Sequence, residues 1–573
     1  MAEPTIQLGG GNWAGKSDNL LGYYKEGERF YKQDFTFSRS TTGTYTDKDG
    51  YIQEMPYNLL QQSNDFDTTW TKTLTTISSN EIDAPIGNEM ADGVIATASS
   101  GGHRVLQAPS TSTSGTFTMF IKQKELSRIC VHFLGTNKAA GFDCSDNTTF
   151  AATGIAAYPT RYTISDFGNG WSKVEMYDVG VTTRVDIYIA NPTEGGNNAV
   201  WTGDGFSKIY FSSSQFVKGS SAKTYFPTTT RLNMPRVDYL NNSNGSLILE
   251  PQRSNLVTYS SDFSDSSWFK LGLGTASTAI VTTDYATSPE GLNNATRLQV
   301  DLNGGTTSSD QSLIYDALTV SSGDNTRSIY VKSNDGNTYD VYFGGTLSSY
   351  EIKEVTSEWT RIDATRNFAS AGTGYLSIGL RGGTGCSDNA DILIYGAQVE
   401  AGSYATTLIN TSGSSVTRNA DACSITDVAD RIGQTEGTIF LDITRDSLES
   451  YTQRIFTLSD GTTSNIIGLQ LTAANQITFY VENGGTNQVI ITKNDATTAN
   501  QKVKIAAAYK ENDFVLYIDG TQVGVDTSGS VPTTSVIKYA NANGSFQYVG
   551  SVNNTKIYNT RLSNSELATL TTL

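Results

Sequence analysis

The chain has 573 residues, of which 37% are hydrophobic and 17% charged, with 54 glycines and 30 tyrosines. This composition excludes a disordered chain, which would carry more charge and fewer aromatic residues, and it excludes a coiled coil or helical repeat. The net charge of −17 repels a phosphate backbone, and the sequence has no basic patch, so nucleic-acid binding is excluded as well. The remaining abundance of Ser, Thr, Asn and Gly predicts an all-β protein of about three to four domains.

Residues 1–54 are predicted to form a separate N-terminal anchor. The first residues lack a basic region followed by an apolar run, and no stretch approaches about 18 apolar residues, so we expect neither a signal peptide nor a membrane span. A Gly-rich start leads into NLLGYYKEGERFYKQ, which could be helical. The segment holds more aromatic surface than a solvated tail would tolerate alone. We assign attachment to a partner protein to five residues: Trp13, Tyr23, Tyr24, Phe30 and Tyr31.

Two short motifs in the anchor look like ligand-binding loops. Residues 10–17, GGNWAGKS, satisfy the phosphate-loop pattern GxxxxGK[ST], but too few residues precede them for the buried parallel strand that such a loop follows. We interpret them as part of the anchor. Residues 47–50, DKDG, hint at a calcium loop, yet Tyr51 and Asn58 stand where further oxygen ligands would be needed. A β-turn that uses Asp-Gly is the better interpretation.

An internal repeat dominates the middle of the chain. The segments at residues 58–72 and 255–270 share Asn-Leu, then Ser-x-Asp-Phe, then Trp near a Lys. Three further matches follow in the same order: residues 118–122 with 328–332, 170–176 with 358–364, and 209–231 with 392–418. Four matches in one order predict two copies of one β module, with Trp171 and Trp359 in equivalent positions.

The repeated pieces have the character of strands. Phe117, Met119 and Ile121 alternate with their neighbours, as in a strand with one buried face. Strands at roughly 8–15-residue spacing, punctuated by Gly and Asn, predict tandem β-sandwich (jelly-roll) domains rather than βαβ units. We place the borders as follows: jelly roll 1 at residues 55–231, a linker at 232–249, jelly roll 2 at 250–418 and a second linker at 419–433.

From about residue 434 the pattern indicates a third β-sandwich, residues 434–573. Residues 468–485 read as two alternating strands around an Ala-Ala-Asn turn, and DFVLYIDGTQV predicts a hairpin that turns at Asp519-Gly520. The end of the chain predicts a short helix with Ser563 or Asn564 as its N-cap. Leu567 and Leu570 would form the apolar side of that helix.

These motifs resemble known families. The order NLL … SxDF … W, then GWxxV, then QxExGxxxT … VTRxAD resembles the carbohydrate-binding-like jelly rolls of tailed-bacteriophage virion proteins, which occur in head fibres, tail fibres and other host-attachment proteins. Jelly roll 2 fits best, with Gln398, Glu400 and Gly402 followed by VTRNAD. Jelly roll 1 departs by carrying Phe-Val-Lys at residues 216–218. Residues 516–523 and 556–570 resemble a laminin-G or concanavalin A-like lectin domain.

The resemblance implies a structural protein of the virion surface, in a head fibre or a tail fibre, that is assembled in the host cytoplasm. It would attach to other virion proteins by its N-terminus and bind host-surface polysaccharide non-covalently. Fibres of this kind also imply a homotrimer, in which three weak lectin sites become one strong attachment. The chain offers no heptads, so a trimer would be held by β surfaces or by residues 20–37. Two other functions stay open, a glycan-degrading tail spike and a capsid decoration without an external ligand.

We expect no catalytic residue, no bound metal and no cofactor. His103 and His132 lack a GxSxG or HExxH context, so nothing indicates a nucleophile with its base. Asp460 in TLSDGTTSN could hold calcium in a lectin-like loop, but an Asp in a turn is the commoner case. The four cysteines are scattered without CxxC spacing, and we expect all of them to be reduced: Cys130, Cys144, Cys386 and Cys423.

The tryptophans are the best candidates for glycan stacking, because aromatic faces pack against sugar rings. Four of them recur between the two copies and are assigned to the shared scaffold: Trp70, Trp171, Trp268 and Trp359. Trp201 has no counterpart in jelly roll 2 and lies in a loop-like stretch rich in Asn and Gly. It is therefore the predicted glycan-binding residue, with packing beneath its loop as the alternative.

Overall fold

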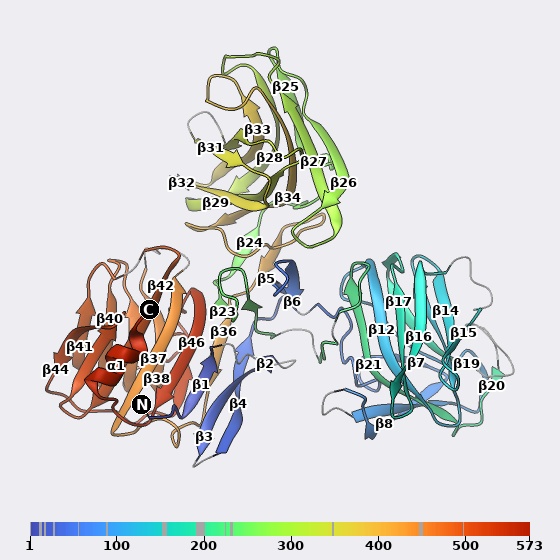
Figure 1. Cartoon of the computed structure of the whole chain (residues 1–573), viewed down its shortest axis with the longest axis horizontal. Helices are drawn as coiled ribbons and strands as arrows, with labels where there is room; N and C mark the ends of the chain where they lie inside the picture. Colours follow the sequence, from blue (N-terminus) through green and yellow to red (C-terminus); the bar gives the residue numbers. More distant parts are fainter. Residues whose placement is uncertain are drawn as a thin grey trace. The chain divides into compact units, whose positions relative to one another are not determined.

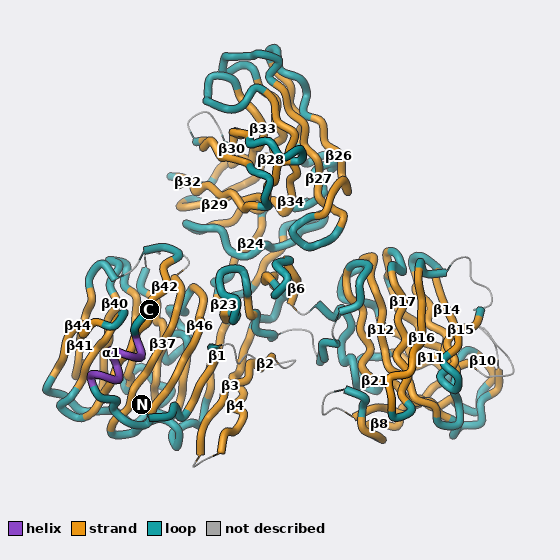
Figure 2. Tube along the Cα trace, viewed as in Figure 1, coloured by secondary structure: helices purple, strands orange, loops and turns teal. Residues whose placement is uncertain are grey.

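The structure, a computed structural model, describes residues 2–10, 14–15, 19–26, 29–55, 57–86, 90–151, 158–190, 201–223, 225–229, 233–345, 349–445, 451–496 and 498–573. Between residues 14 and 34 it describes the backbone alone. Strands dominate, as predicted, and Figure 2 shows the helix α1 (Asn564–Thr571) in purple. Among these residues no helix is long and apolar enough to cross a membrane. The chain divides into two compact units, one made mainly of Pro56–Met234 and the other mainly of Asn19–Met55 and Pro235–Leu573.

Jelly roll 1 is a sandwich of two antiparallel sheets around one apolar core. Its first sheet has the order β15 (Thr148–Phe150), β14 (Lys138–Asp143), β13 (Arg128–Leu134), β19 (Arg184–Ala190), β11 (Arg104–Gln107) and β7 (Thr71–Thr73). Its second sheet has the order β16 (Arg161–Gly168), β17 (Trp171–Tyr177), β12 (Thr113–Gln123), β21 (Lys208–Lys218), β9 (Met90–Ala96) and β8 (Thr75–Asp83). Short pieces complete it: β10 (Ser100–Gly101) pairs with β20 (Trp201–Thr202), and β18 (Val181–Thr182) pairs with β12.

Jelly roll 2 has the same construction. Its first sheet has the order β31 (Tyr350–Val355), β30 (Tyr339–Gly344), β33 (Gly372–Arg381), β28 (Gln311–Val320) and β25 (Phe269–Leu273). Its second sheet has the order β32 (Thr360–Phe368), β29 (Gly323–Ser333), β34 (Asn389–Ala401), β27 (Asn293–Asp301) and β26 (Ile280–Thr287). Strand for strand this is the order of jelly roll 1 without the edge strands β15 and β16. The prediction of two copies of one module is confirmed.

The repeated sequence motif closes each module in the same way. The side chain of Asn58 donates to the carbonyls of Ser214 and Phe226, and its oxygen accepts the amides of Leu60 and Phe216. Asn255 makes the corresponding four bonds in jelly roll 2, to residues 257, 397, 399 and 409. Both amides are fully buried. The Asn that both copies share therefore ties the start of each module to its last long strand and to the segment that follows this strand.

A bulge also recurs between the copies. The register of β12 against β21 shifts between Thr118 and Phe120, and that of β29 against β34 shifts between Ser328 and Tyr330. At the bulge the backbone adopts a positive φ, 54° at Ser213 and 63° at Gly396. Glycine adopts this conformation without strain, whereas serine does so at a cost.

The C-terminal sandwich has its own fold around a separate core. The hydrogen-bonded strands run β44 (Thr521–Asp526), β43 (Phe514–Ile518), β42 (Gln501–Lys510), β37 (Glu436–Arg445), β46 (Gly550–Tyr558), β1 (Ile6–Gly9), β3 (Asn19–Glu26), β4 (Arg29–Ser38), β36 (Ala422–Ile425), β45 (Val536–Lys538), β38 (Gln453–Ser459), β39 (Ile466–Leu471), β40 (Ile477–Asn483) and β41 (Thr486–Lys493). Both predicted hairpins form, at Asp519-Gly520 and at the Ala-Ala-Asn turn. Ser563 caps α1, and Leu567 is buried.

The N-terminal segment corrects two predictions. It is not a separate anchor, because β1 pairs with β46, as Figure 1 shows, and β4 pairs with β36. The C-terminal core includes Ile6 and Leu8 of β1 and Phe35 and Phe37 of β4. Each pair is two residues apart, as expected for side chains on the same face of a strand. The stretch predicted as a helix is instead the hairpin β3–β4, and β2 (Ala14–Gly15) pairs with β3.

The predicted linkers are also structured. In the first, β22 (Val237–Asp238) pairs with β23 (Ser246–Leu249), which pairs in turn with β46. In the second, β36 joins the sheet, and Cys423 and Ile425 are buried. Residues 43–55 form a further hairpin, β5 (Gly43–Thr46) with β6 (Ile52–Met55), and β24 (Arg253–Asn255) pairs with β35 (Val416–Arg418). The segments between the sandwiches therefore form sheets rather than loose connections.

Candidate functional site

A row of aromatic side chains lies on the outer face of the first sheet of jelly roll 2. Phe269 on β25 is opposite Tyr315 on β28, and the row continues through Ser377 and Gly344 to Tyr350. The residues that alternate with them, such as Ile314, Leu376 and Phe343, are fully buried in the core. Side chains of the row must therefore point away from the core.

The aromatic rings are arranged as a platform. The rings of Phe269 and Tyr315 are stacked, with centroids 5.0 Å apart and 14° between their planes, and Tyr375 meets Tyr315 edge-on at 6.0 Å. Phe269 is 52% exposed, although a phenylalanine is usually buried. Further along the row Tyr350 stacks on Tyr342 at 4.9 Å. We call these five residues the aromatic face.

Small residues separate the two ends of the row. Ser377 and Gly344 lie between Tyr315 and Tyr350, so no large side chain rises between the aromatic pairs. Arg381 lies over the ring of Tyr342 at 5.9 Å, and the Tyr342 hydroxyl donates to the carbonyl of Gly345. Tyr342 is fully buried, so the rings that can stack on a sugar are those of Phe269, Tyr315, Tyr375 and Tyr350.

Jelly roll 1 presents different chemistry at the same strand positions. Thr71, Leu106 and Arg184 occupy the places of Phe269, Tyr315 and Tyr375. Arg184 forms two hydrogen bonds with the buried Asp186, at 2.6 and 2.8 Å, and Asp186 also pairs with Arg104. Here the charged groups satisfy one another, and the platform is absent from the described residues of this face.

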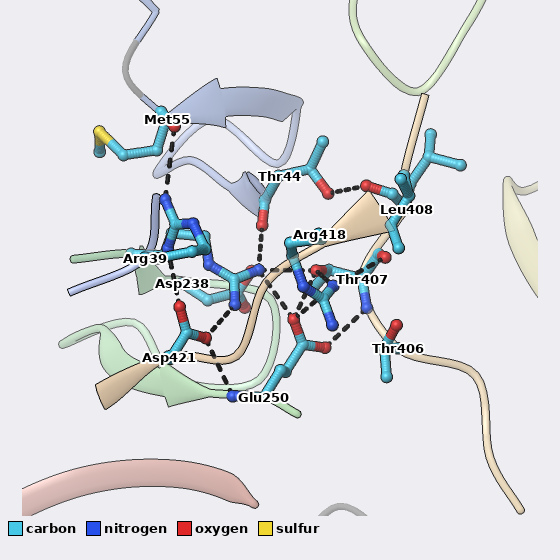
Figure 3. A network of polar contacts seen from close by, with 12 residues as sticks. Arg39, Thr44, Met55, Asp238, Glu250, Thr406, Thr407, Leu408, Arg418 and Asp421 are labelled. Carbon is cyan, nitrogen blue, oxygen red and sulfur yellow. Dashed lines mark hydrogen bonds and ion pairs between the residues drawn. The ribbon is translucent and has the colours of Figure 1, made fainter. Parts of the chain in front are cut away.

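A second candidate is a buried cluster of charged residues from the linking segments. It consists of three arginines and two carboxylates, all at least nine-tenths buried: Arg39, Arg236, Arg418, Glu250 and Asp421. Figure 3 shows Asp421 between Arg39 and the Glu250 backbone, and Glu250 beside Arg418. Arg236 bridges the two carboxylates. Segments that are hundreds of residues apart in the sequence therefore meet in one network.

The charges of the cluster are stabilised by one another. Burial alone would raise the pKa of Glu250, but the charges of Arg418 and Arg236 outweigh it and lower the pKa to about 2. Burial lowers the pKa of Arg39 to about 10. Thr407 adds its amide and its hydroxyl to Glu250, both at 2.7 Å. Glu250 and Arg39 are therefore ionised near neutral pH, and the ion pairs give the cluster a structural role.

A cavity of about 280 Å³ adjoins this cluster. It is lined by residues 41–44, Glu54, residues 408–410 and residues 416–418. Its volume falls just below the range of roughly 300–1,000 Å³ typical of small-molecule sites. We assign no ligand to it.

The family comparison identifies the C-terminal sandwich. Residues 417–568 match the family model described as the concanavalin A-like lectin/glucanases superfamily. This region is a concanavalin A-like domain. Its matched range begins within β35 and includes β36, in agreement with the sheet pairing of the second linker. No curated protein matches the chain.

Several solved structures are similar to parts of the chain. The Ruminococcus gnavus IT-sialidase CBM40 is 16% identical, with 25% of this chain and 85% of that chain covered and a TM-score of 0.22. The CBM22-1-CBM22-2 tandem domain from Paenibacillus barcinonensis Xyn10C is 11% identical, with 60% and 97% covered and a TM-score of 0.22. Domains LG4-5 of the mouse laminin alpha1 chain are 13% identical, with 50% and 90% covered and a TM-score of 0.19.

The structure corrects the prediction for Trp201. The indole is only 6% exposed and packs edge-on against His103, with ring centroids 4.5 Å apart. Its Nε1 donates to the carbonyl of Ile189. Trp201 therefore belongs to the core of jelly roll 1 and offers no free ring face to a sugar. The alternative interpretation, packing beneath its loop, is the one that the structure supports.

Four of the predicted attachment residues lie on the hairpin β3–β4, which pairs with β1 on one side and with β36 on the other. Tyr23 and Tyr24 are on β3, and Phe30 and Tyr31 are on β4, where Tyr24 is opposite Tyr31. Trp13 lies outside the described residues, as does most of the phosphate-loop pattern. The four tyrosine and phenylalanine positions are thus neighbours in one hairpin, and their role in attachment stays a prediction.

The candidate metal ligands are turn residues. Within the concanavalin A-like domain, the Asp460 carboxylate accepts hydrogen bonds from Thr462 and Asn465, and Asp47 accepts the amides of Asp49 and Tyr51. These are the local bonds of Asx turns. Across the described residues, no group of three or more His, Cys, Asp or Glu side chains could hold a metal ion. The four cysteines are free thiols, and burial raises the pKa of Cys144 to about 12.

The aromatic face is the site that sequence reasoning missed. Its members are spread over five strands and share no motif. A signal was nevertheless present at the repeated tryptophan, which is followed by Thr71 in one copy and by Phe269 in the other. Such a difference between the copies, at a strand position that faces outward, indicates a functional surface that only one copy has.

Proposed function

We propose that this protein is a structural component of a tailed-phage virion surface, in a head fibre or tail fibre, and that it binds host-surface glycans without cleaving them. The aromatic face of jelly roll 2 is the proposed binding surface. The observation that carries this proposal is the exposed stack of Phe269 on Tyr315. A single exposed apolar ring is ordinary, but aromatic rings grouped on one surface mark an interaction site.

Sugar rings match this surface chemically. The C–H groups of a pyranose pack on an aromatic face, while hydroxyls at the ring edge bond to polar groups. The aromatic face supplies both, with the rings of Phe269 and Tyr315 and the hydroxyls of Tyr315 and Tyr375. The concanavalin A-like domain at residues 417–568 adds a second fold that is used by lectins.

The virion part of the proposal rests on the repeated motif and on the N-terminal hairpin. Attachment to the particle would use the β3–β4 hairpin, where Tyr23, Tyr24, Phe30 and Tyr31 are neighbours. Assembly as a homotrimer would turn three weak sugar contacts into one lasting attachment, because the second and third contacts form at high effective concentration.

Binding to purified host-surface polysaccharide tests the glycan proposal. The full chain is compared with a Phe269→Ala, Tyr315→Ala double variant, and the matched control is Leu106→Ala at the corresponding position of jelly roll 1. Loss of one to two stacking contacts, at about 1.4 kcal/mol per tenfold, predicts a drop in affinity of about tenfold or more for the double variant. Equal binding by all three proteins would remove the aromatic face from the proposal.

Further measurements separate the depolymerase and capsid-decoration alternatives and test the virion attachment and the trimer. Release of reducing sugars from the same polysaccharide would identify a depolymerase, and failure of the full chain to bind any host polysaccharide would leave a capsid decoration. A particle map with the protein located on head or tail tests virion attachment, and mass measurement in solution tests the trimer.

A further inference from the structure

Two arginines lie at one end of jelly roll 2, inside the sandwich. Arg327 on β29 is in line with Ile329 and Val331, which point into the core, and it is 3% exposed. Its Nη1 is buried and has no hydrogen-bond partner. Arg366 on β32 lies nearby, and burial together with the charge of Arg366 lowers the pKa of Arg327. A buried guanidinium nitrogen without a hydrogen-bond partner is costly, and a bound water or anion would satisfy it.

Jelly roll 1 carries apolar residues at the corresponding positions. Phe117 is the counterpart of Arg327, since it lies on β12 opposite Met176 as Arg327 lies on β29 opposite Ala364. Phe117 packs edge-on against Phe133, with ring centroids 5.8 Å apart. In jelly roll 2 the position of Phe133 falls on Gly345, directly after β30. A pair of apolar rings is thus replaced by a cation and a residue without a side chain.

Gly345 leaves no room for a side chain beside Arg327. A Cβ at this position would lie 3.0 Å from Arg327 Nη1 and 3.0 Å from Ser349 Oγ, tighter than ordinary packing. Ser349 Oγ accepts a hydrogen bond of 2.9 Å from Arg366 Nη1. Because Gly345 has no side chain, Arg327 Nη1 and Ser349 Oγ can both approach its backbone, and Arg366 bonds to the same hydroxyl.

The positive charge here is not neutralised by the protein. Among the described residues neither Arg327 nor Arg366 forms an ion pair. The nearby carboxylate of Glu351 is exposed and pairs with Lys353 at 2.6 Å. In a chain with a net charge of −17, two adjacent arginines without a carboxylate indicate a site for an external anion.

We propose that Arg327, Arg366 and Ser349 bind an oxyanion, the carboxylate or sulfate group of an acidic saccharide. The link to a saccharide rests on the proposed function, because the Tyr342 hydroxyl of the aromatic face bonds to Gly345 and Tyr350 follows Ser349 in the chain. The oxyanion site itself rests on the two arginines alone. Arg366 and Ser349 are half-buried, whereas Arg327 is buried.

Titration of the full chain with sulfate, glucuronate and glucose tests this inference, with chloride at matched ionic strength as the reference. Isothermal calorimetry is the measurement. We expect binding of sulfate or glucuronate but not of chloride, and the stronger of the two identifies the natural group. The key variant is Arg327→Phe with Gly345→Phe, which places the ring pair of jelly roll 1 at these positions, and its thermal unfolding shows whether the module is folded.

The double variant and Arg366→Ala are each expected to weaken oxyanion binding at least tenfold. Arg297→Ala, which removes an arginine of the same module that is already paired with Asp391, is the matched control and should leave binding unchanged. No binding by the unaltered chain, or equal binding by the double variant, overturns the inference. Phe269→Ala separates the two proposals, because it should weaken the binding of a polysaccharide and leave sulfate binding intact.

Discussion

Jelly rolls 1 and 2 have the same strand order but opposite surface chemistry. Both are closed by a buried asparagine, Asn58 or Asn255, with the same four bonds. On the outer face, ion-paired Arg184 in one copy corresponds to Tyr375 in the other. The asparagine that closes each module is thus shared, and the residues of this outer face have diverged. The comparison indicates that function in this chain lies where the copies differ.

The largest effect is expected at the charged cluster, which only the unit containing jelly roll 2 possesses. Asp421→Ala leaves Arg39 and Arg236 buried with one carboxylate fewer, which should cost about 3–5 kcal/mol. Calorimetry of the full chain should show a lower unfolding temperature for that unit and an unchanged transition for jelly roll 1. Asp391→Ala removes a half-exposed ion pair as a control and should cost less than about 1 kcal/mol.

Asn58→Ala and Asn255→Ala test whether the buried asparagine contributes equally to the stability of the two copies. Each substitution leaves buried backbone groups without partners, and we expect a loss of about 2–3 kcal/mol in the module that carries it. Hydrogen exchange of each module in the full chain measures this. Clearly unequal losses would show that the shared bonds do not make shared contributions. Asn303→Ala, in an exposed turn, is the control.

Asp316 predicts a pH dependence that jelly roll 1 lacks. Its counterpart Gln107 makes three hydrogen bonds to Gln61 and Thr69, whereas Asp316, 4% exposed, has an Oδ2 without a partner. Burial raises the pKa of Asp316 to about 6, above its ordinary value of about 3.9. The folded state therefore binds the proton more tightly, and jelly roll 2 should lose stability as the pH rises from about 4 through about 6.

Asp316→Asn should remove this dependence. We expect a gain of about 1–2 kcal/mol at pH 8, which is a few degrees in unfolding temperature, and almost no gain at pH 4. Thermal unfolding at the two pH values measures the difference. A gain of equal size at both would mean that the charge of Asp316 is not the cause.

The smallest effect is expected at the bulge. Gly396→Ala places a Cβ at positive φ and 3.0 Å from Leu408, which should cost about 1 kcal/mol. Ser213→Gly, the reverse change in jelly roll 1, should be neutral or slightly stabilising, because glycine relieves the strain but loses a hydroxyl contact. Chemical denaturation of both variants checks the pair.

How far the sequence predicts this molecule depends on whether a feature is local or depends on long-range pairing. The duplicated module, the Asp519-Gly520 hairpin and the cap at Ser563 were predictable, because each rests on local motifs or on repetition. The hairpin β3–β4 was predicted as a helix, since its tyrosines and charges fit either structure and the pairing with distant strands decides. Trp201 was placed on the surface because no local signal shows that His103 lies against it.

The candidate sites could not be predicted from the sequence for the same reason. The aromatic face and the pair Arg327 and Arg366 each join strands that are separated by many residues, so only the sheet register brings them together. The repeat could have shown the difference between Phe117 and Arg327, but only once the register of both copies was known.

The pairing of β1 with β46 has a consequence for synthesis. Ile6 is opposite Ile557, so the first strand leaves the ribosome on the order of a minute before its partner does, at about 5–20 residues per second. During that time both jelly rolls can fold, while the apolar edge at Ile6 and Leu8 waits uncovered. Such an edge can pair with another nascent chain, and chaperones that shield exposed strands should matter most for this domain. The late closure of one sheet thus makes the time before β46 is synthesised the period in which this protein is most open to misassembly.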